Sequence, residues 1–424
     1  MKRIYSYIIY ITCLTAVLLA GCESKYPYIE YEGNPGKVEF DNFESLMPIR
    51  IAIDDPLYES HTRGTGASDK DMDSIGDIRI YAFYTPTEIH NEPDCADYSK
   101  RMSSEEDENI YCLVDDSNNE NIGHGKKAHL YRGVSPFLKW TDFDEVYYSN
   151  IHPQARYQFF AYHVDDATDM TKSPNRYADY VAYEINIDGT QDLMYSYAQP
   201  TSEQLSQIKD LTNPSNKTFF NNIDKLTYST ESALRDLIPT FKMEHQLAYV
   251  KFFLKAEKVG GVDTLDAEVE KVRVKNIIIK NVPFKGEFIV AAEDTDRLGI
   301  AFTSDSTHYY MPMKNIDGSV VPGNSNGFTP LTPDTIGCWV GAGILLPPAM
   351  KYTLEMDCYI EEGEGKDNSG YNQEFHLSLT EGFKAGHQYE VTIKVYGPRN
   401  ISFNYGSVEW KEGGDISIDE DFKE

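Results

Sequence analysis

The sequence lacks the short motifs that mark the commonest catalytic sites. No HExxH, no GxSxG, no Walker A loop and no strand-linked GxGxxG occurs in its 424 residues. The nearest approach, GHGKKA at 123–128, lacks the first glycine of a P-loop. The ten histidines form no i, i+4 pair, and His245, inside an apolar alternation, is expected to be a hydrogen-bonded core residue rather than a metal ligand. The sequence therefore favours a protein that is not an enzyme and needs neither cofactor nor metal.

The sequence also lacks a complete calcium-binding loop. In the segment DKDMDSIGD, Asp69, Asp71 and Asp73 occupy positions 1, 3 and 5 of an EF-hand-like loop. Position 6 is Ser74, where the turn needs glycine, and position 12 is Ile80, where a glutamate should bind bidentately. The spacing favours a solvated acidic loop over a calcium site.

Basic residues are scarce. Lys and Arg number 39 against 68 Asp and Glu, so the formal net charge is −29. Such a surface repels nucleic acid and bare anionic membrane, so neither is expected as a partner, and it keeps an exported protein soluble.

Long apolar runs are limited to the first residues, which have the pattern of a bacterial lipoprotein signal. Lys2 and Arg3 precede an apolar run at 8–19, and Leu-Ala-Gly-Cys at 19–22 matches the site where such a signal is cut and its cysteine acylated. The run is short for a membrane-spanning helix, the alternative interpretation. We expect residues 1–21 to be removed and Cys22 to carry lipid. The net charge then falls to −31, because Lys2 and Arg3 leave with no acidic residue.

Cysteines with CxxC spacing are absent, which argues against zinc and redox chemistry. Four cysteines remain after Cys13 and Cys22 are set aside. Outside the cytoplasm they can form two disulfides, and of the three connectivities we favour nearest-neighbour pairing. The other possibility is four buried thiols. The favoured pairs are Cys95 with Cys112 and Cys338 with Cys358.

Apolar and polar residues alternate along most of the chain, a pattern typical of β-strands. The 31 tyrosines also favour a turn-rich β protein. The first run, at 46–54, places Ile49, Ile51 and Ile53 on one face. Further strands are predicted at 78–83, 157–164, 181–187, 272–279, 286–291, 352–360, 375–379 and 389–395, with strands continuing almost to the C-terminus. The sequence therefore predicts an all-β fold.

Several segments depart from simple alternation. Residues 58–77 form an open joint of small and acidic residues, and residues 85–126, which are acidic and aperiodic, are expected to be a solvated surface insertion. Residues 200–238 read as helical, with a second short helix from Ser229 through Leu237. In FKMEHQLAYVKFFLKA the apolar phase slips by one residue between Leu247 and Ala248, which predicts a bulge or a bend between sheets.

The order of these pieces resembles the fimbrillins, the subunits of type V pili of Gram-negative anaerobes. The pieces are the lipoprotein signal, an early strand, a loop with an arginine, and then IGDIRIYAFY, INIDGTQDLMYSYA, FKMEHQLAYVKFFL and FKAGHQYEVTIKV…SVEW. The resemblance spans most of the chain, and its specificity lies in the order, since each piece alone is loose. It implies two tandem transthyretin-like β-sandwich domains without enzymatic activity: a leader at 22–63, an N-terminal domain at 64–238 completed by the strand at 46–54, and a C-terminal domain at 239–424.

The resemblance also implies a mode of assembly. Fimbrillins are cut after an arginine in the loop that follows the first strand, and a strand from a neighbouring subunit fills the groove that the lost strand leaves. Arg63 matches that arginine by position, and Gly64 would be the new N-terminus. The strand removed would contain Leu46, Ile49, Ile51 and Ile53, and the donor strand would contain Ile401, Phe403, Tyr405, Val408 and Trp410.

The implied partners are other pilus subunits, outer-membrane lipid through acylated Cys22, and a host or bacterial surface ligand. The implied location is the outer membrane, the cell surface and the fimbrium. The acidic insertion and the acidic C-terminal tail depart from a plain stalk subunit and suit an accessory or tip subunit. The alternative is a surface glycan-binding lipoprotein of an outer-membrane uptake system, which the lipoprotein signal and the tyrosines would also suit.

Overall fold

A computed structural model describes most of the strands of the chain. The described residues are 47–53, 78–85, 96–100, 111–115, 123–131, 137–141, 146–148, 155–164, 173–200, 228–233, 237–257, 271–303, 310–312, 336–360, 371–397 and 400–409. Within them the fold is all-β, as predicted, with one short helix, α4 (Thr230–Ala233), and one 3-10 turn, η4 (Thr295–Arg297). None of the helices in these ranges is long and apolar enough to cross a membrane.

Several predicted sites lie outside the described residues. They are the signal at 1–21, Cys22, Leu46, Arg63, Gly64, the acidic segment DKDMDSIGD, Cys95, the helix expected from Thr201, and Trp410. For these the sequence interpretation stays a prediction.

A seven-stranded sheet forms the centre of the N-terminal half. Its path is β11 (Glu244–His245), β9 (Leu193–Tyr197), β6 (Tyr157–Val164), β2 (Ile78–Tyr84), β4 (Lys126–Tyr131) and β5 (Phe137–Trp140), and β3 (Cys112–Val114) also pairs with β2. Both faces of this sheet are buried. On β2, Ile80 and Ala82 face one apolar cluster, whereas Tyr81 and Phe83 face another. The alternation is therefore between two cores, not between core and solvent.

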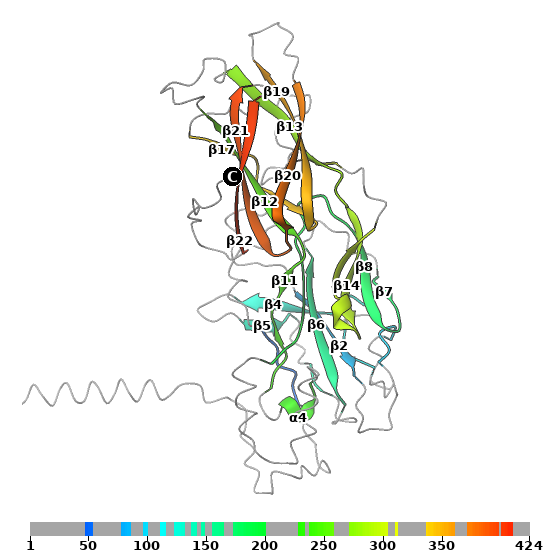
Figure 1. Cartoon of the computed structure of the whole chain (residues 1–424). Coiled ribbons are helices and arrows are strands. Elements are labelled where there is room, and N and C mark those ends of the chain that lie inside the picture. The colour runs from blue at the N-terminus through cyan, green and yellow to red at the C-terminus, as the bar shows by residue number, and fades with distance from the viewer. Residues whose placement is uncertain are drawn as a thin grey trace, which may run out of the picture.

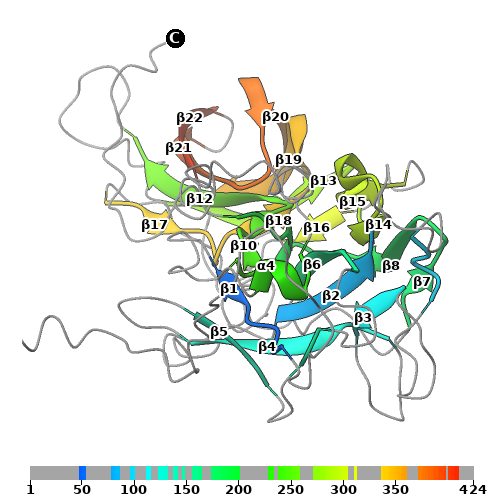
Figure 2. The same cartoon turned by 90° about the horizontal axis from the view of Figure 1, so that it is seen from below.

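One face of this sheet is covered by the start of the chain. The strand β1 (Ala52–Ile53) pairs in parallel with β10 (Thr240–Phe241), and a single bridge joins Pro48 to Tyr147. In Figure 2, β1 lies between β10 and the β4–β5 pair. Helix α4 begins where the second helix is predicted, and Ser229 and Ser232 cap it by exchanging side-chain to backbone hydrogen bonds.

The other face is covered by a four-stranded sheet that draws strands from both halves of the sequence. Its order is β15 (Gly299–Phe302), β14 (Lys285–Ala292), β8 (Tyr180–Asn186) and β7 (Asn175–Arg176). Strands β14 and β15 follow the expected boundary at 238/239, yet β14 pairs with β8 over most of its length. That position is therefore not a boundary between sheets, because the chain returns to complete the N-terminal sandwich.

The C-terminal half is a second sandwich of two sheets. One contains β17 (Cys338–Trp339), β12 (Ala248–Ala256), β21 (His387–Gly397) and β22 (Asn400–Glu409) in that order, with β18 (Ile344–Leu346) also paired to β12. The facing sheet contains β16 (Tyr310–Pro312), β13 (Val272–Lys280), β19 (Ala349–Ile360) and β20 (Tyr371–Phe383). Figure 1 shows this sandwich in the upper half of the molecule, with β2, β4, β5 and β6 below it. In the same view β8 and β14 lie beside these lower strands.

The predicted phase slip marks the passage from one sandwich to the other. Before it, β11 pairs with β9 in the seven-stranded sheet; after it, β12 pairs with β21 in a C-terminal sheet. The prediction of a bend between sheets is confirmed. His245 is hydrogen-bonded as predicted, since its Nδ1 lies 3.0 Å and 2.9 Å from the two carboxylate oxygens of the buried Asp192, but it is half-buried and belongs to neither apolar core cluster.

Two predictions are wrong in this region of the fold. The segment 85–126 is not a wholly solvated insertion, because β3 pairs with β2 and both Tyr98 and Asp115 are buried. The Cys338–Cys358 disulfide does not form: Cys338 is on β17, whereas Cys358 is a buried free thiol on β19 of the facing sheet. Cys112 is buried on β3, and its Sγ donates to the carbonyl oxygen of Val114 at 3.7 Å.

Candidate functional sites

The seat of the first strand is the first candidate site. The side chains of Ile49, Ile51 and Ile53 are 2%, 8% and 8% exposed and join one apolar cluster with Tyr148 and Phe241. At about 1.5–3 kcal/mol for each buried isoleucine, their burial contributes roughly 5–9 kcal/mol. That is of the order of a whole domain's stability. Loss of this strand would leave a deep apolar groove that needs another occupant.

The described backbone hydrogen bonds to the same strand involve a small number of residues. The Ile49 N–H donates to the Val146 carbonyl at 2.6 Å, and the Tyr148 N–H donates to the Met47 carbonyl at 2.9 Å. The Trp140 Nε1–H also donates to the Ile49 carbonyl at 3.0 Å. Beyond these bonds, the ladder with β10 covers two residues. Side-chain burial is therefore the larger part of what holds this strand in place.

The predicted donor strand is the second candidate site. Ile401, Phe403 and Tyr405 lie on β22, at the edge of its sheet, and pack half-buried against the C-terminal core. The strand pairs antiparallel with β21 from Asn400 to Glu409, a span that includes Val408. The Phe403 ring also meets the ring of Phe375 on β20, with centroids 5.0 Å apart. In this monomer the strand is therefore docked on its own chain.

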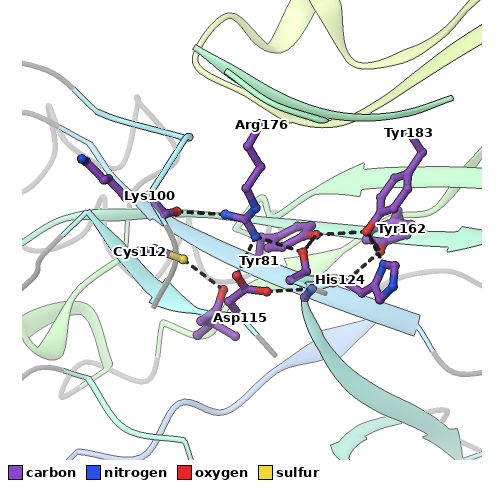
Figure 3. Close-up of polar contacts among 11 residues, drawn as sticks. Tyr81, Lys100, Cys112, Asp115, His124, Tyr162, Arg176 and Tyr183 are labelled. Atoms are coloured by element: carbon purple, nitrogen blue, oxygen red, sulfur yellow. Dashed lines mark hydrogen bonds and ion pairs between the residues drawn. The ribbon is translucent and has the colours of Figure 1, made fainter. Parts of the chain in front are cut away.

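A buried polar cluster between the two N-terminal sheets is the third candidate site (Figure 3). At its centre the guanidinium Nη2 of Arg176 donates to Asp115 Oδ2 at 2.6 Å and to the Gly123 carbonyl at 3.0 Å. The Nη1 of Arg176 donates to the Lys100 carbonyl at 2.9 Å, and the guanidinium carbon lies 5.4 Å from the Tyr81 ring centroid. One side chain from β7 thus holds three separate segments of the insertion.

Three tyrosine hydroxyls continue the cluster. The Tyr81 hydroxyl donates to the Gly123 carbonyl at 2.5 Å, and the Tyr162 hydroxyl donates to the His124 carbonyl at 2.6 Å. The Tyr183 hydroxyl lies 2.8 Å from that of Tyr162 and 2.8 Å from Nδ1 of His124. Because the other two protons go to carbonyls, Tyr183 donates toward Tyr162 when His124 carries its proton on Nδ1. In Figure 3, Tyr183 and Arg176 enter the cluster from the same side, from the paired strands β8 and β7.

Burial sets the charges in this cluster. It raises the pKa of Tyr81, Tyr162 and Tyr183 well above the ordinary value, so all three remain neutral near pH 7. For Arg176, burial acts to lower the pKa of the guanidinium, but the interactions with Asp115, Tyr81, Cys112 and Tyr183 together outweigh it and the net pKa is raised. The site is therefore one fixed ion pair surrounded by neutral donors.

Local backbone geometry brings Asp115 and His124 into the cluster. Gly123 and Gly125 have φ of +75° and +79°, and the Gly125 N–H donates to Asp115 Oδ1 at 2.9 Å. A Cβ on Gly125 would lie 2.9 Å from the Ile80 carbonyl oxygen, so a side chain does not fit there. The GHG of GHGKKA thus forms a turn that binds a carboxylate. Sequence spacing gave no signal for Arg176, because it is 61 residues from Asp115.

The arrangement ties separate segments of the chain together. No group of three or more His, Cys, Asp or Glu side chains converges as a metal site in the part of the chain that the structure describes. What the cluster does is fix three segments, 96–100, 111–115 and 123–125, against β7 and β8.

Comparison with known proteins gives distant similarities. No protein-family model matches the chain, and no curated protein sequence matches it. Among solved structures it is similar to two proteins described as "putative cell adhesion protein". One is from Bacteroides uniformis (11% identity, TM-score 0.41, 87% of this chain and 100% of that one). The other is from Bacteroides ovatus (12%, 0.40, 87% and 100%).

A fimbrial assembly protein from Parabacteroides distasonis is similar as well (10% identity, TM-score 0.38, 86% of this chain and 96% of that one). Superpositions at such TM-scores are too loose to transfer a function. The sites described above therefore depend on the residues of this chain.

Proposed function

We propose that the chain is a structural or accessory subunit of a cell-surface pilus, exported as a lipoprotein through Cys22 and assembled by strand exchange after a cut at Arg63. The observation that carries the proposal is the first strand, whose three isoleucines are buried although its backbone ladder is short. A strand held mainly by its side chains is released as a unit once the chain behind it is cut. The bared groove then accepts a strand from another subunit by main-chain pairing and side-chain insertion.

The position of β22 supports a place at the end of the polymer. This strand has a ten-residue ladder with β21 in its own chain, so giving it to a neighbour means breaking that ladder. A subunit whose β22 stays paired with its own β21 can accept a strand without donating one. We therefore favour an accessory or tip subunit that contributes to adhesion, with Ile401 to Trp410 as the donor only if β22 undocks.

Limited digestion with trypsin tests the proposal. A Cys22→Ser protein that begins at residue 22 is cut, sequenced from its new N-terminus and incubated with a synthetic peptide of residues 400–418, with Arg63→Ala as the uncut control. We expect a chain that begins at Gly64 and forms a complex with the peptide that survives SDS without boiling. An Arg63 that resists cleavage, or a cut protein that retains residues 22–63 and ignores the peptide, contradicts the proposal. Self-polymers without added peptide would favour a stalk role.

The alternative, a glycan-binding lipoprotein of an uptake system, needs no cut at Arg63. An exposed aromatic platform and retention on polysaccharide gels would favour it, and N-terminal sequencing of the cell-surface form separates the two. A lipidated Cys22 on the working protein favours the alternative or an anchored subunit, whereas a start at Gly64 favours assembly.

A further inference from the structure

The tip of the β7–β8 hairpin carries a stack of three side chains. The rings of Tyr177 and Tyr180 are nearly parallel, with centroids 4.3 Å apart and an interplanar angle of 23°. The guanidinium of Arg297, on η4, lies 4.2 Å from the Tyr180 centroid. At such distances one face of a ring has room for one planar group. Arg297 and Tyr177 therefore cover opposite faces of the Tyr180 ring. Tyr177 is thus the outer layer, and it is 42% exposed.

A polar turn borders the exposed ring. The Tyr98 N–H donates to the Ala178 carbonyl at 3.0 Å, and Arg176 donates to the Lys100 carbonyl at 2.9 Å. The turn 97–100 is therefore bonded to the residues on both sides of Tyr177. Its side chains are those of Asp97, Ser99 and Lys100, and the Ser99 N–H and hydroxyl both donate to Asp97 Oδ1.

Tyr177 and the turn 97–100 are both anchored in the core, so the surface that they form is rigid before any ligand binds. Tyr98 is fully buried, with its ring centroid 4.4 Å from that of Phe83. Arg176, next to Tyr177, is fixed by the ion pair with Asp115. The Glu293 N–H also donates to the Asp179 carbonyl at the hairpin turn, at 2.9 Å. A tyrosine held in this way loses little conformational entropy on binding.

We propose that Tyr177 and the turn 97–100 form a carbohydrate-binding site. The inference rests on the adhesive role proposed above and names the chemical class of its ligand. The apolar C–H face of a sugar ring packs on the free face of Tyr177, and its hydroxyls exchange hydrogen bonds with Asp97, Ser99 and Lys100. A net charge of −29 disfavours polyanions, which leaves neutral sugars as the fitting ligand.

A second exposed aromatic lacks these features and provides a control. Trp339 is 49% exposed on β17, the exposed side chain close to it in sequence is the apolar Ile336, and the Nζ of the half-buried Lys251 lies 5.7 Å from its ring centroid. Its ring meets the Phe253 ring edge-on at 5.1 Å. The proposal therefore predicts that replacing Trp339 leaves sugar binding intact.

The test is affinity electrophoresis of the Cys22→Ser protein, begun at residue 22, in native gels cast with yeast mannan, galactomannan, xyloglucan or dextran. We expect retardation by at least one polysaccharide. Tyr177→Ala should weaken binding about tenfold, as the loss of one stacked ring implies. Tyr177→Phe and Trp339→Ala should bind like the parent. Because Tyr177 is exposed, Tyr177→Ala should also keep the parent's thermal unfolding, which confirms that any loss is local.

Two results overturn the site: no retardation by any of the four polysaccharides, or retardation that Tyr177→Ala leaves unchanged. Trypsin-triggered complex formation by Tyr177→Ala, measured in parallel, separates this inference from the pilus proposal. If complexes form and no polysaccharide is bound, the site is wrong and the pilus role stands. If Tyr177-dependent binding occurs and no complexes form, the site stands and the pilus role fails.

Discussion

The two sandwiches of this molecule bury different kinds of side chain. Among the described residues, every buried polar or charged side chain lies at or before Thr240, and Asp115, His124 and Asp192 are among them. Between the C-terminal sheets the buried side chains are largely apolar, such as Val250, Met356 and Ile393, although the hydroxyl of the buried Tyr352 donates to the Pro347 carbonyl. Among the described residues of the C-terminal half, two such sheets pack without a buried ion pair. The polar interior of the N-terminal half therefore does something else, which is to hold the long insertion in one arrangement.

Removal of one partner of the buried ion pair should have the largest effect. Asp115→Ala leaves the Arg176 guanidinium buried and uncompensated, which costs about 3–5 kcal/mol of unfolding free energy. Urea unfolding measures it. Asp115→Leu combined with Arg176→Met removes both charges and should lose clearly less than Asp115→Ala. An unfolding free energy of Asp115→Ala within 1 kcal/mol of the parent's would show that the ion pair does not stabilise the fold. A double variant no more stable than Asp115→Ala would show the same.

Alkaline pH should weaken the N-terminal half through its tyrosines. Burial raises the pKa of Tyr81, Tyr162 and Tyr183, so above the ordinary tyrosine pKa of about 10 the unfolded chain loses protons that the folded chain keeps. Stability is therefore full below about pH 10 and falls as the pH rises. Tyr183→Phe removes one such proton. The unfolding free energy of this variant should therefore fall less steeply with pH, by about 1.4 kcal/mol per pH unit.

Urea titrations at pH 8 to 11 measure this slope. Tyr352→Phe in the C-terminal half should flatten it by the same one-proton amount, since burial raises the pKa of Tyr352 as well. An unchanged slope in Tyr183→Phe would mean that the tyrosine cluster opens before the molecule unfolds.

The contrast between the halves explains which features the sequence could reveal. Period-two alternation located β6, β19 and β21, and the phase slip at Leu247 located the passage between sheets, because these signals are local. The return of β14 to the N-terminal sandwich was missed, since alternation shows that a strand exists and not which strand it pairs with.

The candidate sites divide in the same way. The buried face of Ile49, Ile51 and Ile53 could be read from their spacing. Arg176 and Asp115 could not, because an ion pair across 61 residues leaves no periodic trace and acidic residues in an aperiodic segment favour solvent. Tyr177 was missed for a related reason: its exposure depends on the hairpin turn, which a two-residue strand does not signal.

A conservative truncation in the C-terminal core should cost less than the loss of the ion pair. Ile393 is fully buried on β21, and Ile393→Val removes one methylene, which costs about 0.5–1.5 kcal/mol. Urea unfolding at pH 7 checks the value, and the alkaline slope should not change, because no titrating group is altered. A loss above 3 kcal/mol would mean that the C-terminal core is as specific in its packing as the polar cluster.

The smallest expected effect is the absence of a reaction at Cys358. This thiol is fully buried on β19, and burial raises its pKa to about 12, so at pH 8 it is both protonated and inaccessible. In a protein that begins at residue 22 and has Cys22, Cys95, Cys112 and Cys338 replaced by serine, an aromatic disulfide reagent should leave Cys358 unlabelled in native buffer. Labelling should then rise with urea at the midpoint of global unfolding. Labelling at lower urea would mean that β19 opens locally, and that the apolar half of the molecule, not the polar one, is the weaker of the two.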